Sequence, residues 1–196
     1  VPSSKDWIMG ELSATPMREV SIEELLGRND IHTDQAAVAN WISGRVVLVT
    51  GAAGSIGSEI VRQLLFLKPA KVIVLDQAET PLFEFDHELH SDKCEFVIAD
   101  VRKQDRIQRV FEAFHPTVVF HAAAYKHVPL MENNPSEAIL TNVWGTKILA
   151  DLAVQYGVEK FVMISTDKAV NPTNVMGASK RAAEIYVQSL NQNSKT

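Results

Sequence analysis

The stretch STDKAVNPTNVMGASKR, residues 165–181, gathers side chains suited to proton transfer. Thr166, Asp167 and Lys168 follow one another directly, so a hydroxyl, an acid and a base stand side by side. Alternation along an extended strand would point Asp167 and Lys168 to opposite faces, so we expect the backbone to turn there. A lysine acts as a base only when its pKa is lowered, by desolvation or a nearby cation, and Lys180 could supply that cation. A surface ion pair after a strand is the alternative.

Three evenly spaced glycines indicate a phosphate-binding loop. The segment VLVTGAAGSIGSEI runs from an apolar strand through Gly51, Gly54 and Gly57, with Ser55 and Ile56 between the last two, into an amphipathic helix. Glycines allow a tight turn and close backbone approach, and the amides at a helix start can bind a pyrophosphate. This context favours a dinucleotide site, with a ligand-free glycine turn as the alternative. No Gly-Lys-Ser/Thr follows, which disfavours a Walker-type site.

Residues at the ends of the next strands predict where a dinucleotide would lie. Asp76 ends the second strand, where a carboxylate accepts from ribose hydroxyls and repels the extra phosphate of NADP, so we expect NAD. Asp100 and Val101 close the third strand near the expected adenine, although an acid that caps the next helix is the alternative for Asp100. Ala122 and Ala123 end the fourth strand, where small side chains let the backbone run beside the cofactor. We expect no metal site.

These residues must be positioned by alternating strands and helices. Apolar runs predict five strands, at 45–50, 71–76, 94–100, 117–123 and 160–166. Helical patterns follow them, at 58–68, 81–90, 102–115, 135–157 and 178–191. Buried strands alternating with helices are typical of a parallel sheet covered on both faces. Right-handed crossovers then favour a doubly wound α/β sheet, the Rossmann fold, in strand order 3-2-1-4-5.

Composition narrows the class of protein. The chain has 196 residues, 46% apolar and 22% charged, as in ordinary soluble globular proteins. A net charge of −5 gives no reason to expect nucleic-acid binding. The single cysteine, Cys94, cannot form an internal disulfide, which favours a reducing compartment. No stretch approaches the roughly 20 apolar residues of a membrane span.

The first 44 residues have a different pattern from the rest. A stretch of turn-forming residues precedes a capped helix at 21–28 and a second short helix from Thr33 or Asp34 to Gly44. We therefore predict a linker and N-terminal helical segment over 1–44 and a dinucleotide-binding domain over 45–196. The chain begins without methionine and stops just after a helical run, so we expect a fragment of a longer protein.

Taken together, the glycine loop, HAAAYKHVPLMENNP, TNVWGT and STDKAVNPTNVMGASKR resemble the extended short-chain dehydrogenases/reductases. More narrowly, they resemble the polysaccharide-biosynthesis group of UDP-N-acetylhexosamine 4,6-dehydratases, over about residues 18–193. This resemblance implies an NAD cofactor, a UDP-N-acetylhexosamine substrate and a homo-oligomeric parent anchored at the cytoplasmic face of the bacterial inner membrane. The present chain would then be a soluble fragment, truncated before the part that binds the sugar nucleotide.

The resemblance also implies roles for the residues at the centre. Asp167 would protonate the leaving C6 hydroxyl, Lys168 would remove the C5 proton, Thr166 would hydrogen-bond the C4 hydroxyl, and Lys180 would hold the nicotinamide ribose. The hydride taken from C4 would return to C6. A strand-end threonine and a solvated helix lysine are the alternatives for Thr166 and Lys180. Without the sugar-binding part, the chain alone is expected to bind NAD but to turn over little or nothing.

Met176 departs from the superfamily pattern, in which a tyrosine four residues before the lysine takes the proton of the oxidised hydroxyl. Either the chemistry is lost or another group takes this proton, with Lys168, Thr166 through water, and Tyr125 as candidates. The long family members commonly carry methionine here, which favours the second explanation. Asn142 could adjust the long helix or bind water, or serve as an ordinary polar residue. Tyr125, Lys126 and His127 follow the fourth strand near the expected pocket, where they could take a catalytic part or cap the next helix.

Three other classes of function fit parts of the pattern. A C4 epimerase or a C5-inverting dehydratase could use the same scaffold. A non-catalytic sensor or scaffold could retain the dinucleotide as a structural ligand. A plain NAD-dependent alcohol dehydrogenase is disfavoured by the missing tyrosine.

Overall fold

The computed structural model describes residues 35–193, and the predicted linker and the helix predicted at 21–28 lie outside this range. The described part begins with α3 (Gln35–Ile42), which corresponds to the short helix predicted up to Gly44. The side chain of Ile42 is fully buried in the core of the sheet domain. The predicted boundary after residue 44 stays a prediction.

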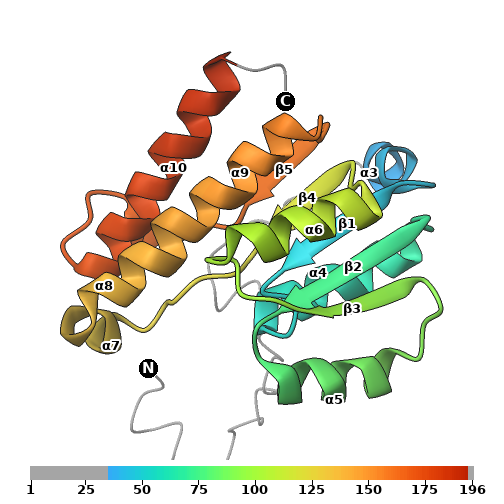
Figure 1. The fold of residues 1–196 in the computed structure, drawn as a ribbon, viewed down its shortest axis with the longest axis horizontal. Coiled ribbons are helices and arrows are strands. Elements are labelled where there is room, and N and C mark those ends of the chain that lie inside the picture. The colour runs from blue at the N-terminus through green and yellow to red at the C-terminus, as the bar shows by residue number, and fades with distance from the viewer. Residues whose placement is uncertain (1–34, 194–196) are drawn as a thin grey trace, which may run out of the picture. The chain divides into compact units, whose positions relative to one another are not determined.

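Five parallel strands form one sheet, in the predicted order β3-β2-β1-β4-β5 (Figure 1). They are β1 (Val46–Thr50), β2 (Lys71–Asp76), β3 (Cys94–Ile98), β4 (Val118–His121) and β5 (Lys160–Met163). In the central strand, Val49 pairs with Val74 of β2 and Phe120 of β4. Because all strands are parallel, their carboxyl ends meet at one edge, where α/β proteins place their ligands.

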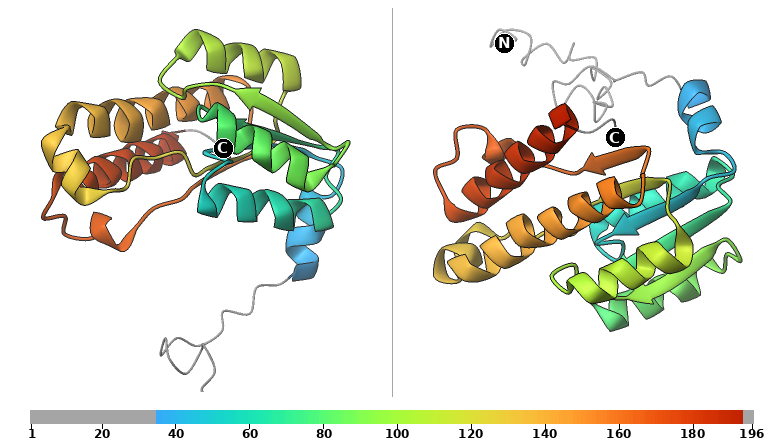
Figure 2. Two further views of the ribbon diagram at one scale, coloured as in Figure 1. Left: turned by 90° about the horizontal axis from the view of Figure 1, so that it is seen from below. Right: turned by 45° about the horizontal axis from the view of Figure 1, so that its top comes forward.

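The helices lie in the connections between strands. They are α4 (Ser55–Phe66), α5 (Glu79–Leu89), α6 (Gln104–Phe114), α7 (Val128–Asn133), α8 (Pro135–Ala138), η1 (Ile139–Gly145), α9 (Thr146–Gln155), η2 (Asp167–Ala169) and α10 (Val175–Asn193). Each connection crosses over one face of the sheet. In Figure 1 and Figure 2, α9 and α10 run side by side.

The core has two apolar layers, one on each face of the sheet. Leu48 of β1 packs with residues of α6 and α9, including Phe111 and Leu149. Its neighbours Val47 and Val49 pack on the opposite face with residues of α4 and α5. Figure 2 shows α6 on one side of the sheet and α4 and α5 on the other. The alternation of side chains along β1 therefore confirms the doubly wound arrangement.

The long helix predicted at 135–157 forms, but its hydrogen-bonding pattern changes in the middle. Residues 135–138 form α8, residues 139–145 form a π-helical segment, η1, and α9 follows. The wider turn brings Asn142 and Thr146, which find buried hydrogen-bond partners, to the interior. The predicted helix is therefore present from Pro135 to Gln155, with a π-helical middle that the sequence analysis did not predict. Short π-helical turns of this kind often occur at functional sites.

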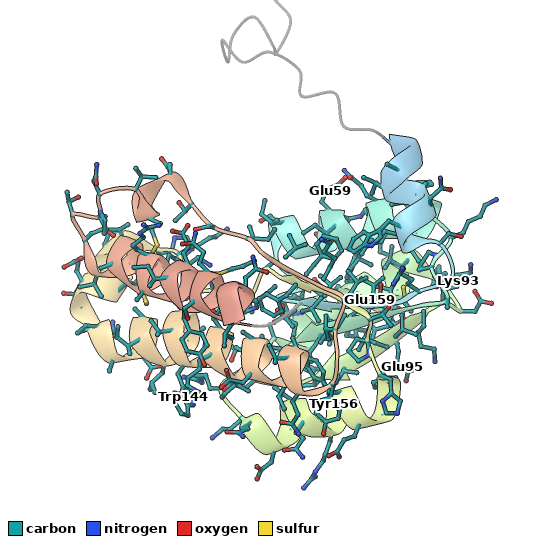
Figure 3. All side chains as sticks on the ribbon, turned by 90° about the horizontal axis from the view of Figure 1, so that it is seen from above. Glu59, Lys93, Glu95, Trp144, Tyr156 and Glu159 are labelled. Atoms are coloured by element: carbon teal, nitrogen blue, oxygen red, sulfur yellow. The ribbon has the colours of Figure 1, made fainter. Side chains whose placement is uncertain are left out.

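The buried apolar side chains gather between the layers. Figure 3 shows other side chains projecting outward from the helices. Trp144, labelled in Figure 3, is 45% exposed, and the Lys147 ammonium lies 5.5 Å from its ring centroid. Within residues 35–193, no helix combines the length and the apolar character needed to cross a membrane.

Candidate dinucleotide site

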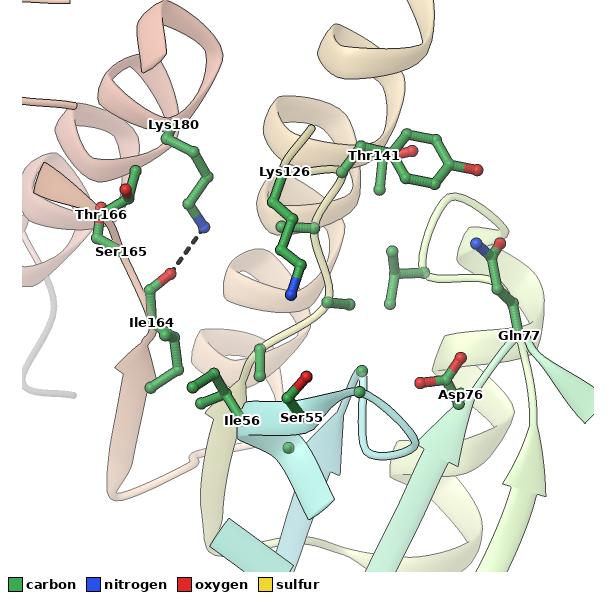
Figure 4. Close-up of a pocket in the computed structure, with 18 of the residues that line it drawn as sticks. Ser55, Ile56, Asp76, Gln77, Lys126, Thr141, Ile164, Ser165, Thr166 and Lys180 are labelled. Carbon is green, nitrogen blue, oxygen red and sulfur yellow. Dashed lines mark hydrogen bonds between the residues drawn. The ribbon is translucent and has the colours of Figure 1, made fainter. Parts of the chain in front are cut away.

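A cavity of about 410 Å³ lies at the carboxyl edge of the sheet. The glycine loop, the ends of β2 and β4, η1, the segment after β5 and the first turns of α10 line it (Figure 4). The fold thus joins the two motifs that the sequence singled out, although more than 100 residues separate them.

The glycine loop begins the cavity. Gly51 has a φ of +67°, and a Cβ placed on it would lie 2.5 Å from the backbone nitrogen of Ala123. A Cβ on Gly57 would lie 2.1 Å from the carbonyl oxygen of Gly51. The loop therefore needs glycine both for its backbone conformation and for close packing. The predicted residues Gly51, Gly54, Ser55, Ile56 and Gly57 all line the cavity, and α4 starts there with no side-chain cap.

Asp76 lies in the cavity wall at the end of β2, as predicted. Its carboxylate accepts hydrogen bonds from the backbone amides of Ala53, at 3.0 Å, and Ala78, at 2.9 Å. These two bonds fix the carboxylate against the glycine loop, and each oxygen has lone pairs left for another donor.

Asp100 and Val101, predicted together near the adenine, separate in the structure. Val101 lines the cavity, whereas Asp100 does not. The Asp100 carboxylate accepts from the backbone amide of Arg102, at 2.9 Å, and forms a 2.7 Å ion pair with its guanidinium, which also pairs with Glu137. Burial raises the pKa of Asp100, but the hydrogen bonds from Arg102 outweigh it and the net change is downward. Ala122 and Ala123 follow the last residue of β4 and line the cavity.

The backbone turns after Thr166, as the sequence required. Thr166 is extended, and η2 begins at Asp167, so the Thr166 hydroxyl can accept from the Lys168 amide, at 3.4 Å, and donate to the Asp167 carboxylate, at 2.9 Å. The Lys168 ammonium lies 3.4 Å from the same carboxylate. Thr166 and Lys168 line the cavity, whereas the Asp167 side chain is 86% exposed and lies outside the lining.

Gly177 lets this turn approach α10. A Cβ on Gly177 would lie only 2.2 Å from the carbonyl oxygen of Lys168. The Gly177 amide donates to the Asn174 side chain, at 2.8 Å, which fixes the start of the helix. The position of Lys168 therefore depends on a glycine that the sequence analysis did not single out.

Lys180 is buried, with 5% of its surface exposed, and its ammonium donates to the carbonyl oxygen of Ile164 at 2.7 Å (Figure 4). Burial lowers the pKa of Lys180 to about 8, against a smaller opposing effect of Glu184. The solvated-lysine alternative is thus wrong for Lys180. Its ammonium projects toward the cavity between the strand end and α10.

Met176 occupies the place of the missing tyrosine as a packing residue. It is 3% exposed and clusters with Met131 and Ala138, and Tyr125 and Val128 pack against this cluster. Met176 also lines the cavity. It therefore offers an apolar wall where the superfamily has an acid–base group.

Lys126 and Thr141 are two of the lining residues that were not predicted as site residues. Lys126, for which helix capping was considered, extends into the cavity from the segment after β4 (Figure 4). Thr141 lines the cavity from η1 and is 4% exposed, yet its hydroxyl has no hydrogen-bond partner within the described part of the chain. The position of Lys126 in the segment after β4 was a usable signal, whereas that of Thr141 depends on the π-helical turn.

These features fit a dinucleotide. The positive φ of Gly51 and the close packing at Gly57 match the roles of the first and third glycines in dinucleotide-binding loops. The buried hydroxyl of Thr141 has no hydrogen-bond partner among the described residues, and the structure gives the buried ammonium of Lys180 one. Buried polar groups are normally fully paired. A ligand with hydroxyl and phosphate oxygens could supply them.

Comparison with known proteins gives an independent result. A family model described as "Polysaccharide biosynthesis protein" matches residues 47–196. The capsular polysaccharide biosynthesis protein CapD of Staphylococcus aureus is 50% identical over 202 residues, which cover 100% of this chain and 34% of CapD. A UDP-N-acetylglucosamine 4,6-dehydratase (inverting) of Campylobacter jejuni is 38% identical, over 72% of this chain and 42% of its own. A UDP-glucose 4-epimerase of Rickettsia rickettsii is 40% identical, over 71% and 42%.

Solved structures agree with the fold. The dTDP-glucose 4,6-dehydratase DesIV of Streptomyces venezuelae, determined with NAD and TYD bound, superimposes with a TM-score of 0.67 at 29% identity. The match covers 75% of this chain and 52% of DesIV. The chain thus spans about a third to a half of the length of these relatives.

Proposed function

Since this chain belongs to the family of polysaccharide biosynthesis proteins, an extended short-chain dehydrogenase/reductase group, we propose that it is the NAD-binding part of a nucleotide-sugar 4,6-dehydratase. One observation carries the proposal: a single cavity joins the glycine loop and Asp76 to Thr166, Lys168 and Lys180. At the relatives' full length, the protein would act on a UDP-N-acetylhexosamine, as a membrane-anchored homo-oligomer.

The charges along the cavity favour NAD over NADP. Asp76 presents a fixed carboxylate at one end, where the adenosine ribose is expected. The lysines that line the cavity, Lys126, Lys168 and Lys180, belong to the segments after β4 and β5 and to α10, and none of them follows β2. Arg102 is occupied by Asp100 and Glu137. A 2′-phosphate would therefore meet a carboxylate without a compensating cation.

We assign the protein residues to the following steps. When bound, NAD supplies a reversible hydride acceptor, so the reaction needs no second redox substrate. Lys180 would hold the nicotinamide ribose with its ammonium. Lys168 would remove the proton from C5 and later return a proton exchanged with solvent.

The geometry of η2 supports a role for Thr166 in place of the missing tyrosine. Hydrogen bonds from Thr166 and then Lys168 lower the pKa of Asp167, so this carboxyl is ionised at neutral pH. We propose that the C4 hydroxyl passes its proton to Asp167 through the Thr166 hydroxyl, which already donates to that carboxylate at 2.9 Å. Asp167, now protonated, would give this proton to the C6 hydroxyl, which leaves as water. Asp167 and Lys168 then both return to their starting forms.

Incubation of the protein, at the full length of its relatives, with UDP-N-acetylglucosamine in heavy water tests the reaction. We expect loss of the C6 hydroxyl and deuterium at C5, detected by NMR. Asp167→Asn and Lys168→Ala should each lower turnover at least ~100-fold. Thr166→Val should do the same, whereas Thr166→Ser keeps the hydroxyl and should retain most activity. Full turnover by Thr166→Val would refute the proton relay.

A C4 epimerase is the second candidate, favoured by the similarity to the Rickettsia rickettsii epimerase. The same experiment separates the two reactions. An epimerase would keep the C6 hydroxyl and leave C5 unlabelled. Tight NAD binding without any change to a UDP-sugar would instead support a non-catalytic role.

A further inference from the structure

A chain of buried polar side chains runs beneath the cavity and has no part in the steps proposed above. It comprises Thr50 at the end of β1, His121 at the end of β4, Thr146 at the start of α9 and Asn142 in η1. All four are at most 1% exposed. Each must therefore find its hydrogen-bond partners within the protein.

The hydrogen bonds fix where the protons lie. The Thr146 hydroxyl donates to the carbonyl oxygen of Asn142 at 2.6 Å, which uses its only proton. Its second contact, with Nε2 of His121 at 2.9 Å, must then be accepted from an Nε2–H. The other ring nitrogen, Nδ1, has no proton and accepts from the Thr50 hydroxyl at 2.7 Å. Burial, with a smaller effect of the Lys180 charge, lowers the pKa of His121 to about 3. The ring is thus neutral, in a single tautomer.

At the other end of this series of hydrogen-bonded side chains, Asn142 connects two walls of the cavity. The Asn142 side chain accepts from the Tyr125 amide at 2.8 Å and donates to the Tyr125 carbonyl at 2.9 Å. It also donates to the Ser179 hydroxyl at 2.9 Å, which in turn donates to the carbonyl oxygen of Met176 at 2.7 Å. Asn142 therefore ties the segment after β4 to the part of α10 that carries Met176 and Lys180.

We propose that His121 is a positioning residue for the dinucleotide. Through its Nε2–H, it holds Thr146 and so keeps η1 in the register that turns Thr141 toward the cavity and places Asn142 between Tyr125 and Ser179. The inference rests on the proposed function only in that the cavity binds NAD. The π-helical turn then has a role in the site, because an ordinary α-helical register would rotate Thr141 and Asn142 relative to the cavity.

Two variants of His121 separate positioning from mere stability. The amide nitrogen of glutamine can reach the place of Nε2, so His121→Gln keeps the donor to Thr146 and loses the acceptor for Thr50. His121→Asn does the reverse. Each loses one buried hydrogen bond, so a structural role predicts similar losses of stability and of NAD affinity. A positioning role predicts that His121→Gln binds NAD within about threefold of the affinity of the unaltered chain. His121→Asn should bind it at least tenfold more weakly. Both affinities are measured by calorimetry on the 196-residue chain.

Two further readouts need no ligand. The imidazole of the unaltered chain should show the Nε2–H tautomer by ¹⁵N NMR from pH 5 to 9, and an Nδ1–H tautomer would overturn the inference. Hydrogen exchange at the Tyr125 amide should accelerate in His121→Asn and not in His121→Gln. If His121→Asn fails to fold, the pair Thr146→Val and Thr146→Ser takes its place, with slow exchange expected only in the serine variant.

These outcomes distinguish the two proposals. If the unaltered chain binds no NAD, the proposed function fails, and the tautomer and the Tyr125 exchange still decide the role of His121. If NAD binds and His121→Asn and His121→Gln weaken it equally, the positioning role is wrong while the proposed function stands.

Discussion

Lys180→Met should make the unliganded chain more stable near neutral pH while weakening its binding of NAD. Lys180 is 5% exposed, and the structure gives its ammonium one hydrogen bond, to the Ile164 carbonyl. Glu184 lies close enough to act on it electrostatically, but too weakly to offset burial. Methionine has a similar length and no charge, so it can fill the same space without the desolvation penalty.

The magnitude follows from the pKa. The value for Lys180 is about 8 in the folded chain, against 10.5 for an exposed lysine. Since one pKa unit corresponds to ~1.4 kcal/mol, retaining the charge destabilises the folded chain by roughly 3 kcal/mol below pH 8. Losing the hydrogen bond to Ile164 offsets ~1 kcal/mol of the gain. We expect Lys180→Met to raise the free energy of unfolding by about 2 kcal/mol at pH 7.

The pH dependence has a definite sign. Below pH 8, folded and unfolded chains both carry the proton, and the full penalty is present. Between pH 8 and 10.5 the unfolded chain binds more protons, so the stability of the unaltered chain rises with pH relative to that of the variant. The advantage of Lys180→Met should therefore disappear across this window.

Urea unfolding of both chains at pH 7 and pH 10.5 checks this, since the titration of all other groups cancels in the difference. Lys160→Met, which removes an exposed lysine at the start of β5, is the matched control and should change stability by less than ~0.5 kcal/mol. NAD affinity of Lys180→Met should fall at least tenfold. A variant that is less stable at pH 7, or an advantage that does not change with pH, would refute the reasoning.

Three other substitutions test separate parts of the site. Gly177→Ala places a Cβ 2.2 Å from the carbonyl oxygen of Lys168. It should lower turnover at least tenfold and leave NAD affinity within about threefold, and unchanged turnover would mean that η2 can move at no cost. Asp76→Asn keeps the size of the side chain and should raise the affinity for NADP relative to NAD in calorimetry, and an unchanged ratio would count against Asp76 as the selector. Met176→Tyr should destabilise the chain by ~1–3 kcal/mol in urea unfolding, because position 176 is 3% exposed, whereas Met176→Leu should destabilise it by less than ~1.5 kcal/mol. Equal stabilities of the two variants would mean that the cluster around Met131 has spare volume.

The strands and the glycine loop were predictable because their signals are local. A strand buried on both faces shows as a continuous apolar run, and Val46–Thr50 and Lys71–Asp76 follow that rule closely. The order of the strands then follows from the handedness of the crossovers. The turn at Asp167 was predictable from the need to bring neighbouring side chains together, and η2 begins at that residue.

The π-helical turn and the side-chain positions of Asp100 and Asp167 were not predictable from local signals. Apolar spacing continues through Ile139–Gly145, so an α-helical pattern hides the wider turn, which depends on the distant partners of Asn142 and Thr146. Asp100 was placed by strand position alone, whereas its side chain is held by Arg102, two residues later. The exposure of Asp167 likewise depends on how η2 packs against α10, through Gly177.

The cavity contains two groups that a folded chain would ordinarily avoid: the buried ammonium of Lys180 and the hydroxyl of Thr141, which has no partner within the described residues. Both lie in the lining of one cavity, one on α10 and the other on η1. An unsatisfied buried hydroxyl destabilises by ~1–3 kcal/mol, in addition to the penalty at Lys180. A ligand that supplied oxygen atoms to both would recover that free energy on binding. The same two groups therefore make the empty chain less stable and the site ready for a polyhydroxylated, phosphate-bearing molecule, which is why removing either should trade affinity for stability.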